Sequence, residues 1–291
     1  MTKNWFKNTG PGTLVAAAFI GPGTVTLCTL AGVNYGFHLL WAMLLSILAT
    51  VVLQEMAARL GIISQKGLSE VIKSEIKHPI INKLMMLLIL SAIVVGNASY
   101  EAGNISGGIL GLETIVGEIR VNLGSYSLNI LSLVVGIIAF TMLYIGNYKF
   151  LERVLVSMVL LMSVSFLITA FLTKPDIMSI FKGALVPSVP EGSLLTIIGL
   201  IGTTVVPYNL FLHASLVKEK WSDQKDLKAV RKDTIISIVL GGLVSMAIII
   251  SASSIGLGEI SNASDLAKSL APLYGDFASY FLGIGLFAAG I

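Results

Sequence analysis

The sequence of 291 residues has little charge, because only 12% of its residues are Asp, Glu, Lys or Arg. No charged residue occurs between Lys7 and Glu55. Hydrophobic residues make up 55% of the chain. At about 20 residues for each transmembrane helix, there is room for roughly seven or eight helices. This composition excludes a soluble protein and predicts an all-α polytopic membrane protein.

Cysteine is almost absent as well, since Cys28 is the single one, so no intrachain disulfide is possible. The sequence also lacks a His-Glu-x-x-His motif, a Cys/His cluster and a Gly-x-Ser-x-Gly elbow. We therefore expect neither an enzyme nor a resident cofactor. Lys3 and Lys7 precede the first apolar run without a small-residue cleavage site, so we expect the first span to direct insertion.

The chain instead contains a series of apolar segments, separated by short polar ones. We expect membrane spans at 12–33, 37–53, 84–112, 126–146, 154–173, 193–217 and 234–255, and a last one from about 277. The separators include the turn Asn34–Gly36, a Pro- and Gly-containing loop over 174–192 and a charged loop over 218–233.

The basic residues indicate how these spans are oriented. If the N-terminus is cytoplasmic and the spans alternate, only four of the 19 Lys and Arg residues face outward, namely Arg120, Lys174, Lys182 and Lys268. The other fifteen then face the cytoplasm, as the positive-inside rule expects. We predict an integral protein of the plasma (inner) membrane with a cytoplasmic N-terminus. A solvated loop explains the basic stretch over 218–233, so we expect no nucleic-acid partner.

The first apolar segment is interrupted by Gly21-Pro22-Gly23, which removes a backbone donor and brings two weak helix formers. Such a break within the bilayer is tolerated where protein or a polar cavity satisfies the backbone, which favours a transport site. The alternative is a proline kink without a ligand.

A second break, at Val206-Pro207, lies in the sixth segment, 185 residues after Pro22. Interrupted helices at corresponding positions of two halves are typical of inverted-repeat transporters. We therefore expect a first five-helix repeat over 1–173 and the start of a second over 174–291, with helices 6, 7 and part of 8. The second repeat is incomplete, so we expect a fragment of a longer protein or a truncated product.

The residues around both breaks resemble the Nramp (MntH-type) divalent metal transporters, which have the LeuT-like fold. That family carries Asp-Pro-Gly-Asn where this chain has Gly21–Thr24, and Met-Pro-His where it has Val206–Tyr208. The flanking runs Leu53-Gln54, Ala58–Gly61 and Asn209–His213 also resemble the family. The resemblance implies metal-ion import coupled to protons (symport), by alternating access.

The resemblance also places a substrate site at the breaks, with altered chemistry. The family's Asp, Asn and Met ligands correspond to Gly21, Thr24 and Val206, and the carbonyls of Ala18 and Thr203 remain. Without a carboxylate or a thioether, a transition-metal ligand set is not expected. Mg²⁺, which keeps several waters, and a small neutral polar solute stay open as substrates, and so does a non-transporting sensor. Further candidate binding residues are Tyr208 and Asn209.

The third segment carries the candidates for a proton pathway. Asn97 and Glu101 lie in the region where the family has acidic residues, and His213 matches a histidine of the family's sixth span. Ionisable residues at such depth favour function, although hydrogen bonding alone would also explain Glu101 and His213. Gly103, Gly107 and Gly111 repeat every four residues, which predicts close helix packing.

Overall fold

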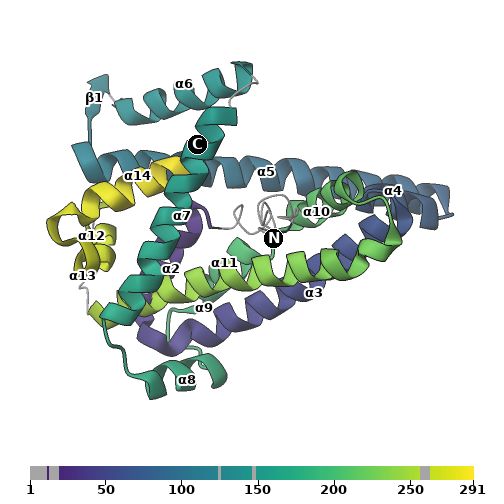
Figure 1. The fold of residues 1–291 in the computed structure, drawn as a ribbon. Coiled ribbons are helices and arrows are strands. Elements are labelled where there is room, and N and C mark those ends of the chain that lie inside the picture. The colour runs from purple at the N-terminus through teal and green to yellow at the C-terminus, as the bar shows by residue number, and fades with distance from the viewer. Residues whose placement is uncertain (1–11, 13–19, 124–125, 146–148, 256–262) are drawn as a thin grey trace, which may run out of the picture. The chain divides into compact units, whose positions relative to one another are not determined.

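The computed structural model describes the chain except residues 1–11, 13–19, 124–125, 146–148 and 256–262. The described part is predominantly helical (Figure 1). The longer helices are α2 (Pro22–Tyr35), α3 (Leu40–Ser64), α5 (Pro79–Val116), α6 (Ile130–Ile145), α7 (Lys149–Leu172), α9 (Leu194–Thr204), α10 (Pro207–Lys220), α11 (Leu227–Ile255) and α14 (Ala278–Gly290). Shorter helices are α4 (Leu68–Glu75), α8 (Ile177–Leu185), α12 (Ala263–Ala267) and α13 (Ala271–Tyr274).

Five helical stretches of the described residues are long and apolar enough to cross a membrane: Pro22–Ser64, Pro79–Val116, Leu194–Lys220, Gln224–Ile255 and Asp265–Gly290. A sixth span results if α7 and α8, which are bent by 118° at their junction, are counted together. The prediction of a polytopic helical membrane protein is therefore confirmed.

The first of these stretches is 43 residues long, about twice what one crossing requires. Gly36 interrupts it with φ of 58°, a left-handed conformation that favours glycine, and a 3₁₀ turn (η2, Gly36–Leu39) follows. Of the turn predicted at Asn34–Gly36, Gly36 is where the helix ends, whereas Asn34 and Tyr35 still belong to α2. Helix α3 continues to Ser64, eleven residues beyond the apolar span expected over 37–53.

The predicted fourth span, 126–146, is wrong at its start. Residues Tyr126–Asn129 form strand β2, which pairs antiparallel with β1 (Arg120–Leu123) in a two-stranded sheet. Asn129 ends the strand, because its Oδ1 accepts a hydrogen bond from the Leu131 N–H at 3.0 Å and caps α6. The remaining helix of 16 residues rises about 24 Å, less than the bilayer core.

Two predicted loops contain helix. Within the loop over 174–192, the Asp176 side chain accepts hydrogen bonds from the N–H groups of Met178 and Ser179 and starts α8. The charged loop over 218–233 is shorter than predicted, because α10 extends to Lys220 and α11 already begins at Leu227.

The chain divides into two compact units. Unit 1 comprises Met1–Phe19, Leu44–Tyr100 and Ile201–Gly242, and unit 2 comprises Ile20–Met43, Glu101–Leu200 and Leu243–Ile291. Each unit takes segments from both predicted repeats, and the division into repeats at residue 173 stays a prediction.

In unit 2, small residues let helices approach closely. Helix α14 packs along α7, where a Cβ on Gly285 would lie 2.6 Å from the Met162 sulfur. Gly111 of α5 meets Gly283 of α14, so that a side chain on either would strike the other's backbone. Membrane helices usually associate through such close contacts, because the hydrophobic effect does not drive helix association within lipid.

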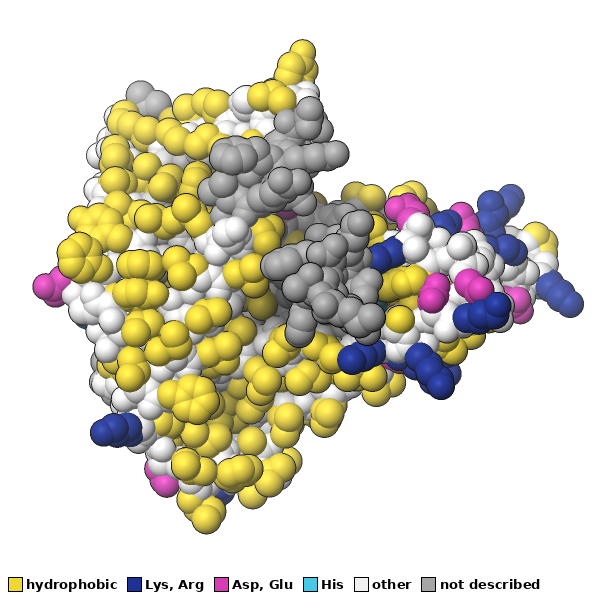
Figure 2. All heavy atoms as spheres, in the orientation of Figure 1, with side chains coloured by type: hydrophobic (Ala, Val, Ile, Leu, Met, Phe, Trp, Pro, Cys, Tyr) yellow, Lys and Arg dark blue, Asp and Glu magenta, His cyan; other side chains and the backbone are white. Residues whose placement is uncertain are grey.

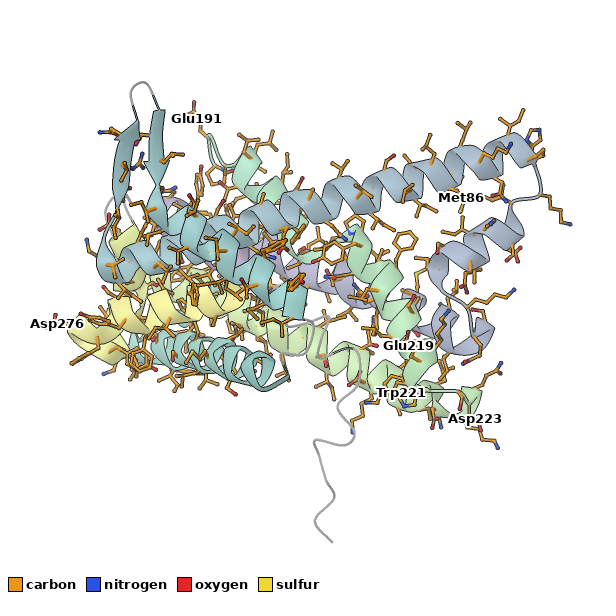
Figure 3. The ribbon with its side chains drawn as sticks, turned by 90° about the horizontal axis from the view of Figure 1, so that it is seen from above. Met86, Glu191, Glu219, Trp221, Asp223 and Asp276 are labelled. Carbon is orange, nitrogen blue, oxygen red and sulfur yellow. The ribbon has the colours of Figure 1, made fainter. Side chains whose placement is uncertain are left out.

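Unit 1 has a charged end, over α4 and the ends of α3 and α10 (Figure 2). Glu219 in the last turn of α10 lies there, and so do Trp221 and Asp223 in the turn after it (Figure 3). Beneath this turn Ala58, Ile62, Val217 and Val230 form a small apolar core, with Trp221 and Leu227 packed against it. This core joins α3, α10 and α11.

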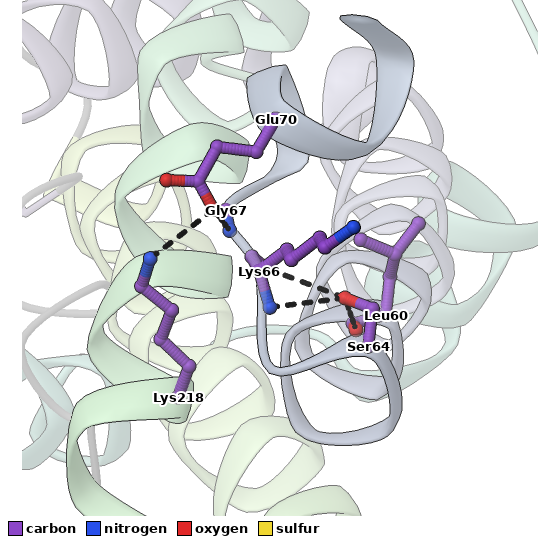
Figure 4. Close-up of polar contacts among 6 residues, drawn as sticks. All are labelled: Leu60, Ser64, Lys66, Gly67, Glu70 and Lys218. Carbon is purple, nitrogen blue, oxygen red and sulfur yellow. Dashed lines mark hydrogen bonds and ion pairs between the residues drawn. The ribbon is translucent and has the colours of Figure 1, made fainter. Parts of the chain in front are cut away.

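The start of α4 is fixed by Glu70 (Figure 4). Its carboxylate accepts a hydrogen bond from the Gly67 N–H at 2.9 Å and lies 3.4 Å from Lys218 Nζ on α10. The hydrogen bond from Gly67, together with Lys218, holds the pKa of this carboxyl below its usual value. Glu70 thus both caps α4 and ties it to α10.

Candidate functional site

The second helix break is present and belongs to unit 1. Helix α9 ends at Thr204, Val206 has extended backbone angles (φ −101°, ψ 118°), and α10 begins at Pro207. The missing N–H of proline suits the first helical position. At this break the carboxyl end of α9 lies next to the amino end of α10. The carbonyl groups of α9 carry a partial negative charge, and the N–H groups of α10 carry a partial positive charge.

Asn209 lies in the first turn of α10 and is fully buried. Neither its Oδ1 nor its Nδ2 has a hydrogen-bond partner among the described residues. An unpartnered buried amide costs about 1–3 kcal/mol, so most buried polar groups are paired. Asn209 therefore offers one acceptor and one donor group to a ligand next to the break.

Two tyrosines flank the break. The Tyr100 hydroxyl of α5 donates a hydrogen bond to the Gly202 carbonyl at 2.7 Å. Its ring stands edge-on to that of Tyr208, with centroids 5.4 Å apart and planes at 81°. Tyr100 thus supports the last turn of α9 and the first turn of α10 together.

A buried polar row runs along α3 beside the break. Ser46, Thr50 and Gln54 follow one another at intervals of four residues, and each is at most 2% exposed. Ser46 Oγ contacts the Thr204 hydroxyl at the end of α9, and the Thr50 hydroxyl donates to the Ser46 carbonyl at 2.8 Å. The row gives the apolar helix one hydrophilic face.

His213 closes this row at the α10 side and is fully buried. Its Nδ1 lies 2.8 Å from Gln54 Oε1, and its Nε2 lies 3.4 Å from the Thr234 hydroxyl of α11. Because Gln54 Oε1 only accepts, this contact places a proton on Nδ1. His213 is four residues after Asn209, so both lie on the same face of α10.

The first break lies in unit 2. Helix α2 begins at Pro22, with Gly21 in extended conformation before it (φ −86°, ψ 175°). Pro22 is packed against Gly107 of α5, where a Cβ would lie 1.9 Å from the proline Cβ. A Cβ on Gly21 would lie 3.4 Å from Asn104 Oδ1, and Thr24 is buried. A close fit with α5 therefore fixes the start of α2.

The other predicted site residues have varied surroundings. Val206 is buried, Thr203 and Tyr208 are half-buried, and Gly23 is exposed. Asn97 and Glu101 are both exposed on α5. Ala18 lies outside the described residues. The two breaks belong to different units, and their joint role in one site stays a prediction.

Helix packing by the glycine row of α5 is confirmed at two positions of the three. Gly107 meets Pro22 and Gly111 meets Gly283, whereas Gly103 is exposed and has nothing within 4 Å of an added Cβ. The packing instead includes Gly108, which adjoins Gly290. Residues spaced by four do not stay on one line along a helix, because one turn of an α-helix takes 3.6 residues. The face of α5 that contacts other helices therefore rotates slowly around the helix axis.

Sequence analysis missed the polar row Ser46–Thr50–Gln54 as a feature of the site. Its signal was available, since polar residues at four-residue intervals in an uncharged span mark one helix face. Glu55 pairs with Arg59, one turn further along α3, at 3.8 Å, but its shorter contact of 2.6 Å is to Arg231 of α11. Within the described residues, no group of three His, Cys, Asp or Glu side chains is placed to hold a metal.

Comparison with known proteins supports the resemblance over nearly the whole chain. The sequence profile of the family described as natural resistance-associated macrophage protein-like (Nramp) matches residues 12–291. The divalent metal cation transporter MntH of Chromohalobacter salexigens is 27% identical over 303 residues, which cover 99% of this chain and 67% of that protein. The metal transporter nramp1 homolog of Dictyostelium discoideum is 27% identical over 300 residues, which cover 99% of this chain and 54% of that protein.

A solved structure shares the fold. The crystal structure of the Eremococcus coleocola manganese transporter in complex with an aromatic bis-isothiourea substituted compound superposes with a TM-score of 0.70 at 19% identity. The match covers 100% of this chain and 64% of that one. The LeuT-like fold that the sequence predicts is thereby confirmed, and the chain spans about two thirds or less of the length of these relatives.

Proposed function

This chain belongs to the Nramp family, and on that premise we propose that it carries a divalent metal cation across the membrane by alternating access. The observation that carries the proposal is the break between α9 and α10 with the unpartnered, fully buried Asn209 beside it. A structural kink alone would not require a buried amide without a partner.

The cargo that suits this break is a cation that keeps part of its water. Asn209 Oδ1 and the carbonyl end of α9 are hard, uncharged oxygen ligands, which Mg²⁺ and Mn²⁺ accept. Gly21, Thr24 and Val206 add no carboxylate or thioether where the family resemblance has them. Retained water compensates for the missing counter-charge, since a bare divalent ion in a low-dielectric site is very costly.

The polar row of α3 supports a path for such a hydrated ion. Ser46, Thr50 and Gln54 extend from the end of α9 toward the charged end of unit 1, and His213 adjoins Gln54. Buried hydroxyl and amide groups replace the hydrogen bonds that the ion's water shell would lose. We propose that Gln54 and His213 separate to admit the ion and close behind it.

Proton coupling, the repeats and orientation belong to the same proposal. Glu101, with Asn97 near it on α5, is proposed to bind the transported proton, and His213 to orient water. Residues 1–173 and 174–291 are proposed to derive from two inverted repeats. The N-terminus is proposed to lie in the cytoplasm, since fifteen of the 19 basic residues then face inward. The proposed location is the plasma membrane.

Uptake into proteoliposomes tests the function. We expect the protein to accumulate Mg²⁺ or Mn²⁺ with saturation, and not a neutral solute of similar size. Glu101→Gln should abolish accumulation driven by a pH gradient while leaving downhill flux intact. The matched control is Glu118→Gln, which changes an exposed carboxylate between α5 and β1. Flux of no divalent ion would contradict the proposal, and unchanged coupling in Glu101→Gln would remove that residue from it.

A further inference from the structure

Unit 1 contains an apolar groove that the transport proposal does not use. Its volume is about 570 Å³, within the usual range for sites that hold a small organic molecule. Seven apolar side chains form most of its wall: Leu53, Met56, Ala57, Leu60 and Ile63 of α3, Leu68 of α4 and Leu210 of α10. Arg59 and Ser64 also line it.

The groove uses a different face of α3 from the polar row. Leu53, Met56, Leu60 and Ile63 are spaced three and four residues apart and form one stripe. Met56 and Ile63 are 51% and 47% exposed, whereas Gln54 and Ala58 on the inward face are buried. The stripe from Leu53 to Ile63 rises about 15 Å, so the groove is elongated along the helix.

The wall of the groove carries a basic side chain, Arg59, whose charge is only partly compensated. Glu55 Oε1 contacts Arg231 Nε at 2.6 Å, and Glu55 Oε2 lies 3.8 Å from Arg59 Nε. One carboxylate thus faces two guanidinium groups and compensates for only one of them. The shorter contact belongs to Arg231, which leaves Arg59 as the group with charge to offer. Arg59 is also half-exposed, so a ligand reaches it without breaking the shorter ion pair.

We propose that this groove binds an anionic glycerophospholipid, with an acyl chain along the apolar stripe and the phosphate at Arg59. The charge complementarity of Arg59 and the elongated apolar wall select a ligand with one negative head and a hydrocarbon tail. The spans place the groove in or beside the bilayer, where such lipids are abundant, and basic pockets near membrane helix ends bind their head groups. Leu210 lies on α10, so the lipid contacts the helix that follows the second break.

Native mass spectrometry of the full chain with added lipids tests this binding. We expect phosphatidylglycerol to bind about fivefold more tightly than phosphatidylcholine with the same acyl chains, since one basic side chain contributes roughly that factor. Arg59→Gln should abolish the difference. Arg120→Gln, which removes an exposed arginine of the hairpin that also pairs with a glutamate, should leave it unchanged.

A second variant tests the apolar part. Met56→Trp fills the groove, keeps Arg59 and changes a side chain that is already exposed, so the fold should persist with unchanged thermal unfolding. It should weaken the binding of both lipids. Equal affinity of the wild type for the two lipids, or equal effects of the two arginine substitutions, would overturn the proposal. Equally tight binding of the free head group, glycerophosphoglycerol, would overturn the role of the groove.

Discussion

At the scale of single residues, Asn209 and Asn129 show what decides whether a side-chain amide stabilises the start of a helix. Asn129 caps α6 and donates to Glu113 Oε1 at 2.6 Å, so both ends of its side chain are used. Asn209 is fully buried, and its amide has no partner within the described residues. A side-chain amide therefore stabilises the start of α6 and destabilises the start of α10, which supports the proposal that Asn209 binds a ligand.

We expect Asn209→Leu to stabilise the substrate-free protein by about 1–3 kcal/mol, because an apolar group of similar shape replaces an unpaired amide. Transport should be lost in the same variant. Thermal unfolding in detergent and uptake by proteoliposomes measure the two effects. Asn129→Leu is the matched control and should lower stability by about 0.5–2 kcal/mol through loss of the cap. A fall in stability for Asn209→Leu would show that the amide has a structural partner.

At the scale of elements, α5 shows that one long helix serves two environments. Its apolar first part offers no buried side chain, whereas Gly107, Gly108, Gly111 and Thr114 in its last part are buried. The difference arises from the partners, since α2 and α14 reach the backbone of α5 only where a glycine leaves room. Gly107 is the tightest of these positions, because Pro22 occupies the space of a Cβ.

Gly107→Ala should therefore destabilise the protein by about 1–3 kcal/mol, as overpacking does, and displace the start of α2. Gly103→Ala lies one turn away on the same helix, in open space, and should stabilise it by up to about 1 kcal/mol. Thermal unfolding of the two variants side by side measures the contrast. Equal effects would mean that Pro22 moves away from α5 without cost.

At the scale of the whole molecule, the distribution of charge predicts orientation. The turn after α2 and the hairpin β1–β2 together carry one basic residue, Arg120, whereas the segments 59–83 and 218–232 carry five and six. The orientation of the protein in the membrane is a property of the entire chain, because successive spans cross the membrane in opposite directions.

Single cysteines report this orientation directly, because the native Cys28 is fully buried and gives an unlabelled background. In intact cells, an impermeant maleimide should label Arg120→Cys. Lys73→Cys on α4 should react only after the membrane is opened. Labelling in the reverse pattern would show that the N-terminus faces outward.

The sequence alone determined the membrane class, the helix starts at Pro22 and Pro207 and the turn at Gly36. These features depend on local chemistry: apolar length, the missing N–H of Pro22 and Pro207, and the left-handed backbone that glycine permits. Family resemblance added the fold, which the comparisons confirm.

Only the tertiary structure decided which groups have partners. The strand at 126–129 depends on pairing with 120–123, and α8 depends on capping by Asp176. The polar row of α3 is buried by helices distant in sequence, and the Asn209 amide has no partner among the described residues. Glu55 has its shorter ion pair with Arg231, 176 positions away, and not with Arg59 on its own helix. These contacts are made between residues more than a hundred positions apart in the chain. A local sequence pattern therefore cannot predict which of them meet.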